Sequence, residues 1–290
     1  MPSRPRRRLD DDVEPIPRRR SRSTRLTTER DALDIPTSAT YHHPDALRGP
    51  APLPAWVPTS ADALDEDLGV MKTGKEADVF LVRRSHGDHA TFLAAKRYRD
   101  GDHRMFHRDA GYLEGRRTRF TRENRAMANR TRFGRQLLAG QWAVAEFAIL
   151  SRLWSAGAAV PYPVQLLGTE LMMELIGDAD GTPAPRLAQL RPSPREAESL
   201  FGQLRAVLVH LAEAGYTHGD LSAYNVLVHD GRLVLIDLPQ AVDLVGNPQG
   251  FEYLRRDCTN ICSWFTARGV DADPEELAST LRASAGWRSS

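Results

Sequence analysis

The sequence predicts an α+β fold of two lobes, in which a small antiparallel sheet precedes a helical lobe. Two patterns predict it. Short apolar runs bounded by turn residues fill the first half after the N-terminal segment, whereas apolar residues at helical spacing dominate the second half. An acidic, proline-containing connection over residues 178–185 separates the two patterns. With 290 residues, the chain is long enough for one two-lobed domain or two small ones.

Residues 1–55 are predicted to form a disordered basic tail. They mix Arg, Asp, Ser, Thr and Pro without periodicity, and residues 1–30 hold ten Arg against five acidic residues. No signal-peptide core follows the Arg, and no apolar run is long enough to span a bilayer. Cys258 and Cys262 fall in one expected helix and are interpreted as buried thiols. We therefore expect a cytoplasmic protein without membrane contact.

The sheet lobe is predicted over residues 56–176. Alternating or continuous apolar runs indicate five strands, at residues 68–72, 77–82, 91–96, 164–167 and 171–177. The turn between the first two strands is Thr73, Gly74, Lys75 and Glu76, at the place where a kinase folds a loop over nucleotide phosphates. This turn lacks the three-glycine pattern, so a plain hairpin turn is the alternative.

Lysine is rare in this chain. Of 39 basic residues only three are Lys, namely Lys72, Lys75 and Lys96. Lys96 ends its strand as Leu-Ala-Ala-Lys, close to the Val-Ala-Ile-Lys form whose Lys reaches the α and β phosphates of ATP. A Lys whose stem merely covers apolar surface is the alternative. A phosphate-binding Lys needs a Glu on a following helix, and Glu146 lies in the helix predicted over residues 136–154, where a solvated position is the other interpretation.

The helical lobe is predicted over residues 177–290. A helix is expected to begin at Ser193-Pro194 and to end near Gly215, followed by helices near residues 248–267 and 274–284. Between the first two of these helices lie two short strands and the loop that carries the most informative residues.

That loop reads His-Gly-Asp-Leu-Ser-Ala-Tyr-Asn over residues 218–225. Asp220 is followed five positions later by Asn225, and Asp237 ends the next buried strand, which is the arrangement of protein kinases. Amide and carboxylate oxygens suit magnesium, so Asn225 and Asp237 are the predicted metal ligands. Asp220 is the predicted general base or positioning group for the attacking oxygen. A surface turn between strands is the alternative interpretation.

Taken in this order, the motifs resemble those of the RIO family of atypical protein kinases, particularly its first branch. The resemblance is carried by residues 72–79, 95–96, 142–146, 173–177, 218–225, 236–240 and 251–260. It implies a two-lobed protein-kinase-like fold and a serine/threonine kinase that phosphorylates itself or another protein, or acts as an ATPase. It also implies ATP with magnesium, or manganese in its place, and roles in ribosome maturation.

The resemblance also implies residue roles. Asp220, Lys96 and Asp237 would be catalytic, and Lys96 would be held by Glu146. The nucleotide would lie against the following residues: Thr73, Gly74, Lys75, Val79, Met173, Glu174 and Ile176. In this family the metal-binding Asp has also been discussed as a phosphate acceptor, so Asp237 would serve either an ATPase-like cycle or direct transfer to Ser.

Two other functions remain open. A small-molecule kinase of the aminoglycoside phosphotransferase type also has a His-Gly-Asp-Leu loop followed by Asn, although the region after Asp237 looks short for its helical substrate cap. An ATP-sensing binding module for ribosome or RNA assembly would be expected to lack Lys96, Asp220 or Asp237, and all three are present.

Residues 97–135 are predicted to form a basic insertion, with twelve Arg against five acidic residues and a net charge of +7. The segment is longer than most loops in compact domains. Its aromatic residues are interspersed among the Arg, which favours RNA or ribosomal contact by phosphate binding and base stacking. A lid over ATP and a solvated basic loop without a partner are the alternatives.

Overall fold

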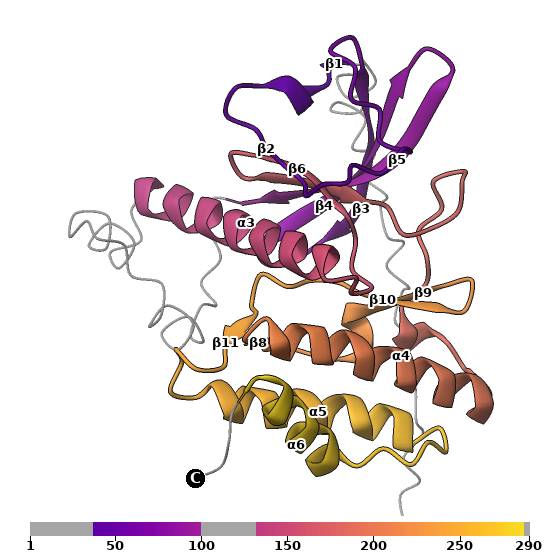
Figure 1. Ribbon diagram of the computed structural model, residues 1–290. Helices are drawn as coiled ribbons and strands as arrows, with labels where there is room; N and C mark the ends of the chain where they lie inside the picture. The colour runs from indigo at the N-terminus through magenta and orange to yellow at the C-terminus, as the bar shows by residue number, and fades with distance from the viewer. Residues whose placement is uncertain (1–36, 100–131, 287–290) are drawn as a thin grey trace, which may run out of the picture.

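The computed structural model describes residues 37–99 and 132–286. Within these ranges the first lobe is a seven-stranded antiparallel sheet of order β1-β3-β4-β5-β7-β6-β2. Its strands are β1 (Thr37–Ser38), β2 (Leu47–Arg48), β3 (Leu64–Thr73), β4 (Ala77–His86), β5 (His89–Tyr98), β6 (Pro163–Leu167) and β7 (Glu170–Glu174). Figure 1 shows this sheet at one end of the molecule, with one long helix between it and the remaining helices.

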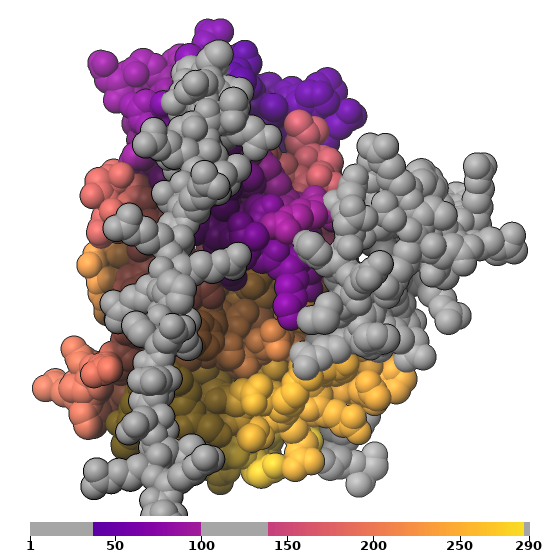
Figure 2. All heavy atoms as spheres, turned by 180° about the vertical axis from the view of Figure 1, so that it is seen from behind, coloured from indigo at the N-terminus to yellow at the C-terminus, as the bar shows by residue number. Residues whose placement is uncertain are grey.

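The second lobe is helical. Its helices are α4 (Pro194–Glu213), α5 (Gly250–Thr266) and α6 (Pro274–Ser284), and α3 (Arg132–Ser155) packs against the sheet of the first lobe. Short paired strands lie between α4 and α5: β8 (Tyr216–Thr217) with β11 (Val242–Asp243), and β9 (Val226–His229) with β10 (Arg232–Leu235). The predicted α+β, two-lobed fold is confirmed. Seen from behind, the sheet lobe again lies above the helical lobe (Figure 2).

The start of α4 shows why the sequence signals were reliable there. The Ser193 hydroxyl accepts from the Glu196 amide while the Glu196 carboxylate accepts from the Ser193 amide, so two otherwise unpaired backbone groups are satisfied. At the other end, Gly215 has a φ of +87°, the left-handed conformation that glycine adopts without steric cost. The helix therefore begins and ends where its sequence predicts.

Strand β5 separates two environments. Leu93 and Ala95 point into a small core on one face of the sheet, and Tyr98 points into the main core on the other face. Side chains alternate along a strand, so Lys96 shares the face of Tyr98. This alternation places the Lys96 ammonium between the two lobes.

The structure differs from the predicted tail over residues 37–55. These residues cover the small core of the sheet, and Tyr41 and Ala46 are buried. Strand β1 pairs with β3, and β2 pairs with β6. The composition of this segment indicated disorder, but a few apolar side chains and short edge pairings are enough to hold a segment on a preformed sheet. Residues 1–36 of the predicted tail lie outside the described residues.

The predicted insertion at residues 97–135 is shorter in the structure. Arg97 and Tyr98 still belong to β5, and α3 already begins at Arg132. Residues 100–131 lie outside the described residues. The boundary predicted between residues 176 and 177 stays a prediction. None of the described helices is both long enough and apolar enough to cross a membrane.

Candidate active site

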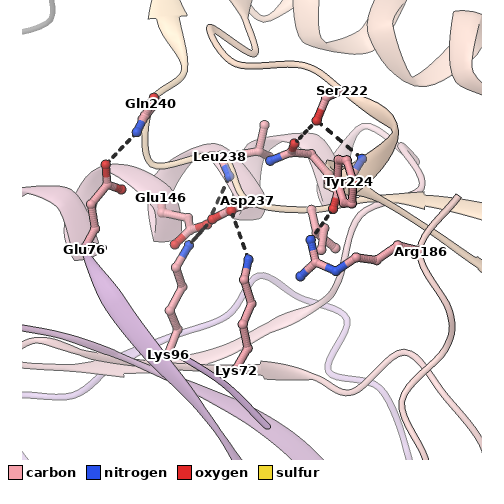
Figure 3. Close-up of polar contacts among 12 residues, drawn as sticks. Lys72, Glu76, Lys96, Glu146, Arg186, Ser222, Tyr224, Asp237, Leu238 and Gln240 are labelled. Carbon is pink, nitrogen blue, oxygen red and sulfur yellow. Dashed lines mark hydrogen bonds and ion pairs between the residues drawn. The ribbon is translucent and has the colours of Figure 1, made fainter. Parts of the chain in front are cut away.

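Lys96 joins two carboxylates from different parts of the chain. Its Nζ atom lies 2.9 Å from Glu146 Oε1 and 2.6 Å from Asp237 Oδ1. Lys96 comes from β5, Glu146 from α3 and Asp237 from the segment after β10. Figure 3 shows the three side chains converging between the lobes. Residues 50 and 141 positions apart in the sequence therefore form one charged cluster.

The charges in this cluster stabilise one another. The charge of Lys96 holds the pKa of Asp237 far below its usual range, with burial opposing the shift. Burial disfavours the Lys96 ammonium, but Glu146 and Asp237 outweigh it, so the pKa of Lys96 lies well above its usual value. At neutral pH we therefore expect Lys96 and Asp237 both to be charged.

Glu146 is fixed by three donors. Besides Lys96, the Tyr98 hydroxyl donates to Oε2, and the Leu238 amide donates to Oε1 over 3.0 Å. Burial, followed by the nearby charge of Glu146, raises the pKa of Tyr98 well above its usual value, so this hydroxyl keeps its proton. Glu146 is only 1% exposed, and its bond to Leu238 links α3 directly to the segment that carries Asp237.

Asp237 occupies an unusual backbone conformation, with a φ of +71°. Asp tolerates this left-handed region better than most other residues except glycine. The preceding residue, Ile236, donates its amide to the Asn225 carbonyl over 2.9 Å, and its carbonyl lies 3.1 Å from His218 Nε2. The loop at residues 218–225 and the segment around Asp237 are therefore tied together through the backbone.

The loop at residues 218–225 is anchored by Asp257 of α5. Its Oδ2 accepts from the Gly219 amide over 2.7 Å and from the Thr217 hydroxyl over 2.8 Å, and its Oδ1 accepts from the Leu221 amide over 2.9 Å. Arg256 adds a bond to the Gly219 carbonyl. Asp220 is exposed between the two anchored amides, so its backbone is held on both sides while its side chain is free to meet an acceptor.

Asn225 sits at the end of the same loop and is 9% exposed. Its Oδ1 atom accepts from the Ser222 hydroxyl over 2.7 Å, which fixes the orientation of the amide. A carbonyl oxygen has two lone pairs, so this bond leaves one of them for a metal ion. The Arg186 guanidinium donates to the Tyr224 carbonyl next to Asn225 (Figure 3).

The turn between β3 and β4 is closed tightly. The Gly74 amide donates to the Ala77 carbonyl over 3.0 Å, and a Cβ atom at Gly74 would lie 2.8 Å from that oxygen, so only glycine fits without a shift. Lys75 is exposed at its tip. Glu76 accepts from Gln240 over 2.5 Å, and burial raises the pKa of Glu76. The turn is thereby linked to the segment after Asp237.

The predicted adenine side lies on β7 and the residues after it. Met173, Glu174 and Ile176 are all half-buried, and β7 pairs with β5 next to Lys96. Glu174 Oε2 accepts from the Tyr162 amide over 3.0 Å, and burial raises the pKa of Glu174. The Ile176 carbonyl accepts from the Ala184 amide. The Glu174 carboxylate and the Ile176 carbonyl are thus already hydrogen-bonded within the protein.

The polar side chains of this site fit magnesium and a nucleotide. Asp237 and Asn225 offer a carboxylate and an amide oxygen, the hard ligands that magnesium takes from proteins, usually one or two at a time. Both oxygens of Asp237 already face lysine ammonium groups, at 2.6 Å from Lys96 and 3.9 Å from Lys72, so the site is built to neutralise this carboxylate with cations. The ammonium groups in turn suit phosphate oxygens.

The structure brings together Lys96, Glu146 and Asp237 as the sequence led us to expect, and it ties Asn225 to the segment of Asp237. The roles of these residues toward a nucleotide stay predictions. Sequence reasoning assigned no role to Asp257, although a signal was present. Asp257 occupies a position of the apolar stripe formed by Leu254, Ile261 and Phe265 of α5, where a charged residue needs a buried partner.

Comparison with known proteins shows which family this chain is similar to. A family model of the RIO domain matches residues 73–277. The chain is 39% identical over 215 residues to the RIO-type serine/threonine-protein kinase Rio1 of Haloferax volcanii, covering 74% of this chain and 68% of that protein. It is 32% identical over 212 residues to the serine/threonine-protein kinase RIO1 of Caenorhabditis elegans, covering 70% of this chain but only 37% of that longer protein.

Solved structures agree on the fold. The Rio2 kinase-ADP/Mg2+-phosphoaspartate complex from Chaetomium thermophilum superimposes with a TM-score of 0.52 at 23% identity, covering 75% of this chain and 65% of that chain. The Rio2 kinase from the same organism gives a TM-score of 0.51 at 23% identity, with 75% and 67% covered. At this identity the likeness concerns the fold alone.

Proposed function

The chain belongs to the RIO family, and on that premise we propose that it is an ATP- and magnesium-dependent serine/threonine protein kinase. Its acceptor would be a Ser or Thr of another protein or of the chain itself, with ATP hydrolysis as the other outcome of the same site. The observation that carries the proposal is the Lys96–Glu146–Asp237 cluster, which unites three separate elements at one point between the lobes.

Phosphoryl transfer depends mostly on positioning and charge neutralisation, and the described residues supply both. Lys96, fixed by Glu146, would bind the α and β phosphates, while Thr73, Gly74 and Lys75 would cover them. Asp237 and Asn225 would hold magnesium, which when bound neutralises charge on the phosphates. Asp220 would orient the acceptor hydroxyl and take its proton, because the amides on either side of it are held by Asp257.

Replacing Lys96 by Met tests the nucleotide side of the proposal. Met has a similar volume but no charge, so we expect ATP to bind about 10- to 100-fold more weakly, the usual range for losing a hydrogen bond to a charged group. Titration calorimetry with ATP and magnesium would measure the loss. Circular dichroism would check that the variant is folded, because Glu146 loses its cation.

Arg97→Met is the matched control. Arg97 is the next residue of β5, faces the other way and also joins two carboxylates, at 2.6 Å to Asp67 and 2.5 Å to Glu170. We expect this variant to bind ATP like the parent. Equal losses in the two variants would show a general effect on the sheet and would remove Lys96 from the nucleotide site.

The fate of the γ-phosphate distinguishes kinase from ATPase action. After incubation with γ-labelled ATP, label that stays on the protein through hydroxylamine treatment and acid would support transfer to Ser or Thr. Label released by hydroxylamine would indicate a carboxyl phosphate and an ATPase cycle. If the parent neither labels itself or an added protein acceptor nor releases phosphate in the presence of magnesium, the proposed function is wrong.

RNA contact through the basic segment belongs to the same proposal, although residues 100–131 lie outside the described part of the structure. The support is the net charge of +7 over residues 97–135. We expect salt-sensitive binding to structured RNA that disappears when Arg116, Arg117 and Arg119 become Ala together, with the ATPase rate largely kept. A gel-shift titration at two salt concentrations measures it, and equal RNA binding by the triple variant and the parent would exclude this segment.

A cytoplasmic location is likewise proposed. Its support is that Cys258 and Cys262 are free and buried, in helix α5, and burial raises the pKa of Cys258 to about 12. Such thiols resist oxidation, and free thiols are usual in reducing compartments.

A further inference from the structure

Lys72 lies at the end of β3, and its direction is set by an irregularity in the strand. Val70 pairs with Phe80 of β4, whereas Lys72 pairs with Val79, so β3 has one extra residue, Met71, at this point. In a regular continuation Met71 would lie opposite Val79, and Lys72 would face the other side of the sheet. The register shift therefore turns Lys72 to the face that Met71 would otherwise occupy.

That face is the one that carries Lys96. Val79 lies opposite Lys72 on one side and opposite Lys96 of β5 on the other. Residues directly opposite one another in antiparallel strands share a face of the sheet. Lys72 and Lys96 thus flank Val79 in a single row across three strands. Figure 3 shows both side chains reaching toward Asp237.

The two lysines hold Asp237 unequally. Lys96 Nζ lies 2.6 Å from Oδ1 and is also bound to Glu146, and its side chain is 9% exposed. Lys72 Nζ lies 3.9 Å from Oδ2, and its side chain is 43% exposed. Lys96 is thereby locked in place by two carboxylates, while Lys72 makes one long ion pair at the edge of the site. Of the two, Lys72 is the cation that can leave Asp237 at little cost.

The surroundings of Lys72 favour an anion. Burial lowers the pKa of Lys72. The negative charges of Asp237 and Glu146 act against this shift, whereas the positive charges of Arg186 and Lys96 lower the pKa further. Lys72 and Lys96 both face Asp237, and Arg186, which precedes η3 (Leu187–Gln189), is close enough for its charge to act on Lys72. Once Asp237 is neutralised by a metal ion, Lys96 keeps its bond to Glu146, whereas Lys72 loses the carboxylate that it faces.

We propose that Lys72 is a second phosphate-binding lysine of this site, which rests on Asp237 in the free protein and moves to the nucleotide phosphates when a divalent cation occupies Asp237. This inference builds on the proposed function and adds an exchange of partners to it. The alternative is an exposed ion pair of no consequence, which is the usual case on protein surfaces. Two observations oppose that alternative: the register shift that aims the side chain, and the use of Lys at only three of 39 basic positions.

Calorimetric titrations of Lys72→Met with three ligands test the exchange. ADP with magnesium should bind about tenfold more weakly, because one charge-assisted phosphate contact is lost. Adenosine, which has no phosphate, should bind as it does to the parent. Mn²⁺ without nucleotide should bind up to about fivefold more tightly, because a cation that competes for Asp237 is gone. Lys72→Arg, which keeps the charge, should retain most of the ADP affinity.

Arg83→Met is the matched control. Arg83 belongs to the same β3–β4 ladder, its side chain is 44% exposed, and it pairs with Glu66 at 3.6 Å, close to the values of Lys72. We expect this variant to bind all three ligands like the parent.

Three outcomes would overturn this inference alone. Unchanged ADP affinity in Lys72→Met would exclude a phosphate contact, and an equal loss for ADP and adenosine would show a structural effect instead. Unchanged or weaker Mn²⁺ binding would exclude the exchange at Asp237. A parent that binds neither ADP nor adenosine would overturn the proposed function itself, and Lys72 with it, whereas the first three outcomes leave the proposed function intact.

Discussion

Asp237→Asn should lower magnesium-dependent turnover by about 10³-fold, because a metal ligand contributes several kcal/mol to the transition state and each 1.36 kcal/mol is a factor of ten. Asn is the informative substitution because Asp237 has a φ of +71°, a conformation that Asn tolerates and Ala does not. An amide oxygen is a weaker magnesium ligand than a carboxylate, so raising the magnesium concentration should restore activity only in part. Release of labelled phosphate across a magnesium series measures both effects.

The chain offers a close control. Asp230 also has a left-handed backbone, with a φ of +49°, and lies exposed in the turn between β9 and β10. Asp230→Asn makes the same chemical change at the same kind of backbone position, and we expect it to keep full activity. Full activity in Asp237→Asn as well would refute the assignment of Asp237 as a metal ligand.

Asp65→Asn should destabilise the sheet lobe by about 3–5 kcal/mol, the usual cost of breaking a buried ion pair. The Arg84 guanidinium is 0% exposed and Asp65 8%, and two bonds of 2.7 and 2.8 Å join them. Asn cannot satisfy the charge, so a buried guanidinium would be left without its counter-ion. Denaturant unfolding followed by circular dichroism measures the loss.

Glu66→Gln is the control for this prediction. Glu66 is the next residue of β3 and pairs with Arg83 at 3.6 Å on the surface, where such pairs contribute about 0–1 kcal/mol. The double variant Asp65→Leu with Arg84→Met should recover much of the stability lost in Asp65→Asn, since apolar side chains can replace a buried pair. If Asp65→Asn and Glu66→Gln unfold at the same denaturant concentration, the buried pair carries no special weight.

Predictions from the sequence were most accurate where a residue type has few possible roles in a folded protein. In the sequence Lys96 ends an apolar run in a chain with few Lys, so its contact with a Glu of a later helix could be anticipated, and Glu146 lies among the apolar residues of the next predicted helix. The helices of the second lobe were predictable because their caps and their apolar spacing are local signals.

The rest depended on relations between segments. The register shift that turns Lys72 toward Asp237 exists only in the pairing of β3 with β4, and neither strand alone contains it. Residues 37–55 are held by a sheet formed elsewhere in the chain, so their own composition gave a misleading prediction. Composition and periodicity describe one segment at a time. Strand register, and the covering of a sheet by another segment, depend on two segments together.

The anchoring of the loop by Asp257 has a consequence for the order in which the protein becomes competent during its synthesis. Gly219 and Leu221 precede Asp257 by 38 and 36 residues, so a ribosome releases both amides before the carboxylate that fixes their loop. Until α5 has emerged, two amides around Asp220 lack their acceptor, and buried donors without acceptors are costly. A nascent chain that stops before residue 257 would therefore carry every residue that we propose for the nucleotide site and still fail to hold Asp220 in place. We therefore expect the loop around Asp220 to become fixed only after α5 has been made.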